Sequence, residues 1–232
     1  MQKLSTPTLL LALGMLWMGI DAPLRATTIF DNSAHDLGTR FDPGTNEAGD
    51  EILLADTARY LTTFSFEYWG VNTTHPTYFD GSIQARVKFY RNTGALVLGY
   101  ASPSPASFFD SGWFSVPNPT DRLTFDFTAG SDLPSGGLFI PTSDMTWSVQ
   151  FQGMALSDSV GVDLYTPPLI GDDYTDYWEN DSGWMLCTNG VPMDFAALLQ
   201  ANSTVPEPSI ITLWICGGLG ILTLARRLRR KA

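Results

Sequence analysis

The chain has 232 residues, with 24 acidic and 13 basic side chains and a formal net charge of −11. Only six of the basic residues lie between Thr27 and Pro208, against 23 acidic residues, so this central part has a net charge of −17. Such a charge repels phosphates and excludes nucleic acid as a partner. The central part has about 180 residues, enough for one domain with its own core.

The first 26 residues have the features of a secretory signal peptide. Lys3 precedes an apolar run at residues 9–20, and the chain then turns polar and reaches Ala26. This order predicts passage through the secretion translocon and cleavage after Ala26, with Ala22 as the alternative site. A membrane-anchoring helix is the other interpretation, but twelve apolar residues are too few to span a bilayer comfortably.

Residues 27–201 alternate repeatedly between apolar and polar side chains, which is typical of strands with one buried face. Aromatic residues make up 12% of the chain, and 21 glycines and 15 prolines interrupt it, which favours strands and turns over helices. The five predicted apolar faces are Phe64, Phe66 and Tyr68; Ile83, Ala85, Val87 and Phe89; Leu123, Phe125 and Phe127; Trp147, Val149 and Phe151; and Val160, Val162 and Leu164.

Turn sequences separate these segments, among them Asp42-Pro43-Gly44 and Asp110-Ser111-Gly112. Many short strands at this spacing predict an all-β domain, an antiparallel two-sheet β-sandwich that is jelly-roll-like. No long helix is expected before residue 202, and residues 193–200 fit either a helical turn or a closing strand.

Acidic residues are densest between Gly171 and Asp181. Calcium takes six to eight hard oxygen ligands, so this stretch is a candidate calcium site, although its spacing differs from that of an EF-hand. The alternative is an exposed acidic loop that Tyr177 and Trp178 anchor to the core. The segment 36–51 offers either further ligands or a solvated loop, and no other cofactor is expected. The candidate calcium ligands are Asp172, Asp173, Asp176, Glu179 and Asp181.

Exposed aromatic rings would provide contacts for sugars. Alternation places Tyr90 and Tyr165 on the outer faces of their strands, and Trp178 lies in the acidic stretch, so these three are the candidate glycan contacts. Enzyme signatures are weak: His35 and His75 do not form a metal pair of known spacing, and no nucleophile elbow occurs. We therefore expect no enzymatic activity, with a glycoside hydrolase as the least favoured alternative.

The C-terminal part reads as a linker and a membrane anchor. Residues 202–208 form the predicted linker, and residues 209–225 carry no charge. At 1.5 Å per residue, this stretch would reach roughly 25 Å as a helix, enough to cross a thin bilayer. Residues 226–232 form a basic tail that keeps the C-terminus in the cytoplasm and the acidic domain outside. The arginines that stop transfer are Arg226, Arg227, Arg229 and Arg230.

The motif Val205-Pro206-Glu207-Pro208, followed by an apolar segment and an arginine cluster, resembles the PEP-CTERM sorting signal of Gram-negative bacteria. The resemblance implies an exosortase-type processing enzyme as a partner. It also implies an inner-membrane stage before delivery to the cell surface or to an extracellular, polysaccharide-rich matrix. The prolines hold Glu207 in an extended conformation that suits a protease. A permanent single-span anchor is the alternative.

The domain itself resembles the lectin-like, choice-of-anchor sandwiches that often precede this signal. The similar segments are TTIFDNS from Thr27, EILLADTARYLTTFSFEYWG from Glu51 and DDYTDYWENDSGWML from Asp172. The expected function is non-enzymatic binding or structural support in the cell envelope or biofilm matrix. The alternative is a carbohydrate-binding module that recognises an exopolysaccharide.

Overall fold

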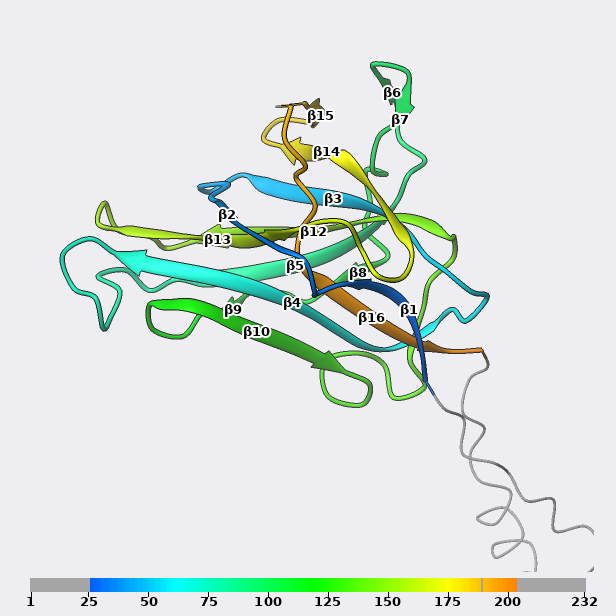
Figure 1. Cartoon of the computed structure of the whole chain (residues 1–232), viewed down its shortest axis with the longest axis horizontal. Helices are drawn as coiled ribbons and strands as arrows, with labels where there is room; N and C mark the ends of the chain where they lie inside the picture. The colour runs from blue at the N-terminus through cyan, green and yellow to red at the C-terminus, as the bar shows by residue number, and fades with distance from the viewer. Residues whose placement is uncertain (1–25, 189, 204–232) are drawn as a thin grey trace, which may run out of the picture.

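The computed structural model describes residues 26–188 and 190–203, which form 16 strands. Two seven-stranded antiparallel sheets contain all but two of these strands. The first sheet consists of β1 (Thr27–Asn32), β2 (Asp36–Phe41), β4 (Tyr60–Asn72), β10 (Thr120–Thr128), β11 (Leu138–Phe139), β13 (Asp158–Tyr165) and β16 (Ala197–Asn202). The second consists of β3 (Glu47–Leu53), β5 (Gln84–Arg91), β8 (Phe109–Asp110), β9 (Phe114–Ser115), β12 (Asp144–Gln152), β14 (Asp172–Asn180) and β15 (Trp184–Cys187). The hairpin of β6 (Leu96–Val97) and β7 (Tyr100–Ala101) projects from the sheets (Figure 1).

The first sheet forks along its longest strand, β4. Phe66 pairs with Phe125 of β10 on one side and with Ala197 of β16 on the other, whereas Tyr68 pairs with Val162 of β13. Strands β16 and β13 therefore occupy successive halves of the same edge of β4. Beyond the fork, β1 extends the sheet from β16 and β2 extends it from β13.

The apolar faces of the two sheets meet in one aromatic core. Trp147 of β12 lies at its centre, with ring centroids 5.3 Å from Phe64 and 5.6 Å from Phe195. Burial of so many large side chains is the main force that holds the two sheets together.

The structure confirms the predicted all-β antiparallel sandwich and most of the predicted strand faces. The inward residues of β4, β5, β12 and β13 are buried as alternation predicts. Strand β10 departs from the prediction, because it lies at an edge and Leu123 remains 40% exposed. Residues 197–202 form the closing strand β16, so the alternative of a helical turn there is wrong.

Both acidic segments are largely strand, which corrects the interpretation of either one as a loop. Residues 36–51 contain β2 and most of β3, and residues 172–180 form β14. In β3 the side chains of Ala48, Asp50 and Ile52 are all buried on the same face. The acidic residues of these segments therefore divide between the core and the outer faces.

The two ends of the described chain lie side by side, because Thr27 of β1 pairs with Ala201 of β16. Figure 1 shows the start of β1 and the end of β16 at the same corner of the sandwich. Residues 26–188 and 190–203 include no helix long and apolar enough to cross a membrane. The predicted signal peptide up to Arg25, the motif at 205–208, the span at 209–225 and the arginine cluster lie outside the described residues.

Candidate functional site

The three aromatic residues predicted as glycan contacts are buried, which corrects that prediction. Their exposed fractions are 4% for Tyr90, 2% for Tyr165 and 0% for Trp178. Alternation assigned the two tyrosines to the outer faces, but other side chains cover them. Trp184 packs edge-on against Tyr90 at 5.2 Å, and the guanidinium of Arg122 lies 5.4 Å from the ring of Tyr165.

Each of these aromatic residues donates a hydrogen bond to a glutamate, so their polar atoms are used within the fold. The donor–acceptor distances are 2.8 Å for Tyr90 to Glu47, 2.7 Å for Tyr165 to Glu67 and 2.8 Å for Trp178 to Glu51. Glu47 and Glu67 belong to polar clusters that sequence reasoning did not identify.

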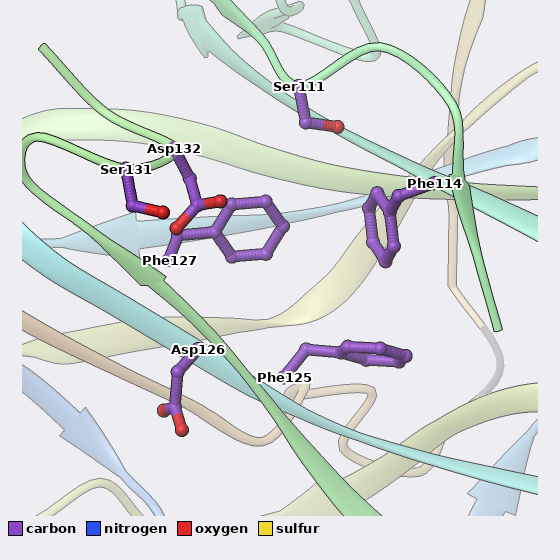
Figure 2. Close-up of a pocket in the computed structure, with 7 residues that line it drawn as sticks. All are labelled: Ser111, Phe114, Phe125, Asp126, Phe127, Ser131 and Asp132. Carbon is purple, nitrogen blue, oxygen red and sulfur yellow. The ribbon is translucent and has the colours of Figure 1, made fainter. Parts of the chain in front are cut away.

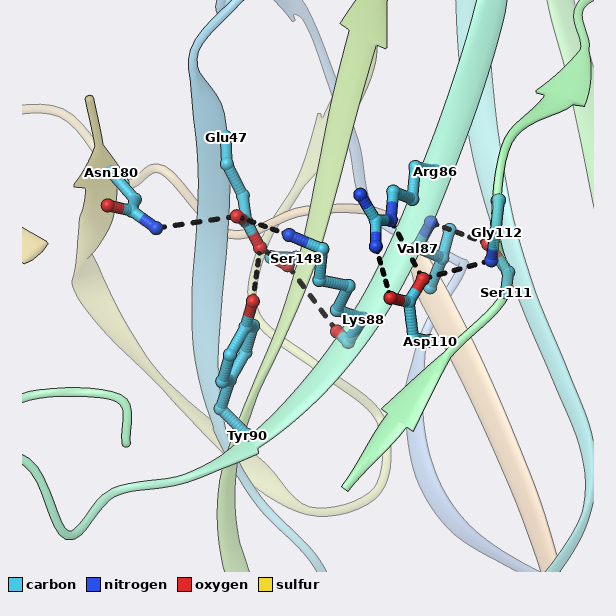
Figure 3. Close-up of polar contacts among 10 residues, drawn as sticks. All are labelled: Glu47, Arg86, Val87, Lys88, Tyr90, Asp110, Ser111, Gly112, Ser148 and Asn180. Carbon is cyan, nitrogen blue, oxygen red and sulfur yellow. Dashed lines mark hydrogen bonds and ion pairs between the residues drawn. The ribbon is translucent and has the colours of Figure 1, made fainter. Parts of the chain in front are cut away.

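The Glu47 cluster lies on the outer face of the second sheet. The carboxylate of Glu47 accepts hydrogen bonds from Tyr90 and from Ser148, the latter at 2.6 Å, and pairs with the ammonium group of Lys88 at 2.8 Å. Asn180 approaches the same carboxylate at 3.4 Å (Figure 3). This buried charge is therefore fully partnered, as a buried carboxylate requires.

A second cluster lies on the outer face of the first sheet and contains two arginines. Arg40 lies 3.3 Å from the carboxylate of Asp163, and Arg122 lies 3.0 Å from that of Glu67. Burial raises the pKa of Asp163 to about 6, while Arg40 and Arg122 oppose that rise. The positive charges thus offset much of the cost of burying Asp163.

A third cluster lies inside the sandwich, at the fork of the first sheet. It contains Asn32 at the end of β1, Asp50 on β3, Asp173 on β14 and Asp194 in the segment before β16. Asp173 of β14 faces the interior because it is the pairing partner of Ile52 of β3, whose side chain is buried. Of the five candidate calcium ligands, the structure brings Asp173 alone into this cluster.

The other four candidate ligands are dispersed along β14 and the turn that follows it. Asp172 and Asp181 are exposed and Asp176 is half-buried. Glu179 accepts a hydrogen bond from Asn46. Successive side chains of a strand point to opposite faces, so these residues do not converge on one ion. The predicted five-residue calcium site is therefore wrong as a set.

Backbone and amide contacts hold the third cluster together. The amide nitrogen of Asn32 donates to the carbonyl oxygen of Tyr165 at 2.8 Å and lies 3.5 Å from the carboxylate of Asp173. The backbone N–H of Phe195 donates to Asp50 at 2.9 Å, and the N–H of Tyr165 donates to the carbonyl of Asp194 at 2.9 Å. The cluster therefore joins β1 and β13 of one sheet to β3 of the other.

The carboxyl groups of this cluster have strongly raised pKa values. Burial, and then repulsion from Asp173 and Asp194, raises the pKa of Asp50 well above its usual range. Burial also raises the pKa of Asp173 to about 7 and that of Asp194 to about 6. Each shift records an energetic cost of keeping the ionised form inside the fold.

A cavity of about 440 Å³ opens beside the edge strand β10. Its apolar wall consists of Phe114, Phe125 and Phe127, whose rings surround the opening in Figure 2. Asp132 places its carboxylate beside Phe127, and Ser111 lies above Phe127 and Phe114 in this view. Aromatic rings next to hydroxyl and carboxyl groups can contact the apolar face and the hydroxyls of a sugar.

Comparison with known proteins found no family model, curated protein or solved structure that matches this chain.

Proposed function

We propose that this chain is an exported cell-envelope or extracellular-matrix protein of a Gram-negative bacterium. Its jelly-roll-like sandwich has a non-enzymatic binding or structural role. A signal peptide delivers the domain through the translocon, and an exosortase-type enzyme processes the C-terminal PEP-CTERM signal. The protein then passes from the inner membrane to the cell surface or to a polysaccharide-rich matrix.

The tripartite C-terminal sequence carries this proposal, and the position of the chain ends supports it. Thr27 follows the predicted signal cleavage site, and Ala201 precedes the predicted linker. These two residues are partners across β1 and β16. Both processing points are thus attached at one end of the sandwich, and cutting at either leaves the strands and their core intact.

We expect the substitution Glu207→Ala to prevent processing of the C-terminus in the organism that makes the protein. The prolines present Glu207 in an extended segment, and its carboxylate is the charged group that an enzyme could recognise there. Intact-mass measurement of the membrane and extracellular fractions would find the variant uncut and confined to the membrane.

Thr204→Ala is the matched control, because it changes the same linker outside the motif and should be processed normally. Normal processing of Glu207→Ala would contradict the sorting proposal. A tail that stays attached in the wild type would favour the permanent anchor.

The cavity beside β10 favours a second candidate function, recognition of an exopolysaccharide. Its volume is about 440 Å³, and the half-buried rings of Phe114 and Phe125 provide a wall for stacking, whereas Phe127 is 7% exposed. This site replaces the buried aromatic residues Tyr90, Tyr165 and Trp178 as the candidate glycan contact.

On an array of bacterial glycans, we expect the full chain to bind one class of polysaccharide saturably. Phe125→Ala should then weaken binding by about two- to tenfold, since a stacked ring contributes about 0.5–1.5 kcal/mol. Phe139→Ala is the control, because Phe139 is 54% exposed on β11, outside this cavity. An array without saturable binding would contradict the glycan proposal and leave a structural role.

A further inference from the structure

Four oxygen atoms of the third cluster are buried without a hydrogen-bond partner. They are Oδ1 of Asn32, Oδ1 of Asp50 and both carboxylate oxygens of Asp194. All three residues have an exposed fraction of 0%. A buried acceptor without a donor costs about 1–3 kcal/mol, and more when it is charged. Unless bound protons or a cation compensate them, four such atoms destabilise the fold.

The other buried acidic residues show how this protein normally compensates burial. Glu47 has Lys88, and Asp163 has Arg40 and Arg122. In contrast, the charged groups that act on Asp50, Asp173 and Asp194 are all acidic: each other, Glu51 and Asp172. Within the described residues, this cluster therefore contains the acceptors and the negative charge of an ion site without a basic side chain to balance them.

We propose that Asn32, Asp50, Asp173 and Asp194 bind one divalent cation, with the chemistry of calcium, and that the ion fastens the two sheets together. Carboxylate and amide oxygens are the ligands that calcium prefers, and calcium accepts six to eight of them in irregular arrangements. Zinc favours nitrogen and sulfur ligands, which these four residues lack. The side chain of Thr166 acts on Asp194 and lowers the pKa of its carboxyl group.

Binding requires the carboxylates to approach one another. In the described part of the chain, no three Asp, Glu, His or Cys side chains already stand in an arrangement that could hold a metal ion. Mutual repulsion keeps the three aspartates of an ion-free cluster apart, and an ion reverses the sign of that interaction. Binding therefore requires side-chain rotation, which is least restricted at the half-buried Asp173.

The ion would connect the parts of the fold that are farthest apart in sequence. Asn32 is at the end of the first strand, and Asp194 lies three residues before the last. Asp50 and Asp173 belong to neighbouring strands of the opposite sheet. This inference is independent of export and sorting, so its test succeeds or fails separately from that of the proposed function.

The test measures calcium binding to the full chain, purified in detergent and stripped with EGTA. Calorimetric titration with CaCl₂ should give one site with half-saturation at about 0.1–1 mM, the range of extracellular calcium modules. At 10 mM CaCl₂ the melting temperature should rise by about 5 °C. Asp194→Asn should abolish both effects, and Asp126→Asn, an acidic residue in the cavity beside β10, should leave both unchanged.

A stability measurement in EGTA keeps the test decisive. Because Asp194→Asn removes an unpartnered buried charge, the ion-free variant should melt no lower than the ion-free wild type. Asp173→Asn, at a half-buried position, should weaken calcium binding at least tenfold. Equal melting temperatures of the wild type with calcium and with EGTA would overturn the proposal and leave a cluster that binds protons only. Undiminished calcium binding by both variants would also overturn it.

Discussion

Replacing Lys88 with methionine is expected to lower the free energy of unfolding by about 3 kcal/mol, the typical loss when one partner of a buried ion pair is removed. The side chain of Glu47 is 4% exposed and that of Lys88 is 14% exposed. Tyr90 and Ser148 would still donate to Glu47, but its charge would lack a counterion. Urea denaturation followed by tryptophan fluorescence measures the loss.

Two further variants separate the ion pair from the packing of the lysine stem. Adding Glu47→Gln to Lys88→Met removes the buried charge and should recover at least about 1 kcal/mol. Arg86→Met disrupts the neighbouring pair with Asp110, whose side chains are 30% and 35% exposed, and should cost no more than about 1 kcal/mol. Equal losses for Lys88→Met and Arg86→Met would show that the Glu47 cluster behaves as an ordinary surface pair.

Gly161→Ala is expected to destabilise the first sheet by about 3 kcal/mol, at the upper end for an overpacked site. A Cβ atom on Gly161 would lie 1.8 Å from the carbonyl oxygen of Phe41 and 2.7 Å from its carbonyl carbon. Both contacts are with backbone, so β2 must move away from β13. The melting temperature should fall by about 6–12 °C for a domain of this size.

Gly49→Ala is the matched control in the second sheet. There the shortest contact of the added Cβ is with the side-chain methyl of Thr146 at 2.6 Å, and a side chain can move more easily than a strand. The expected loss is therefore smaller than for Gly161→Ala. If Gly161→Ala had the same melting temperature as the wild type, β2 would be only loosely held against β13.

The sequence predicted the fold well wherever an apolar face alternates with a polar one. Phe64, Phe66 and Tyr68 on β4 face the core as expected, because sheet burial repeats every second residue. The sequence also predicted the turn at Asp42-Pro43-Gly44 correctly. Asp42 accepts a hydrogen bond from the N–H of Gly44 at 2.8 Å, and Gly44 adopts a φ of 61°, which glycine tolerates best.

Acidic strands were missed because their partners come from distant parts of the chain. Asp50 lies between Ala48 and Ile52 on an inward face. In a sequence, a carboxylate at such a position favours the prediction of a loop, because buried strand faces are usually apolar. The burial of Tyr90 and Tyr165 was unpredictable for a similar reason. Trp184 and Arg122, which cover them, are 94 and 43 residues away in sequence. The alternation of Ala48, Asp50 and Ile52 was the one local signal of the interior cluster.

The position of β16 has a mechanical consequence for a protein held by its C-terminal end. This strand lies between β1 and β4, with antiparallel hydrogen bonds along both edges. Tension on the tail acts along the axis of β16, perpendicular to those hydrogen bonds, so it loads them together in shear and does not break them one at a time. A domain anchored by its C-terminal end would therefore be held through a strand that is hydrogen-bonded along both edges.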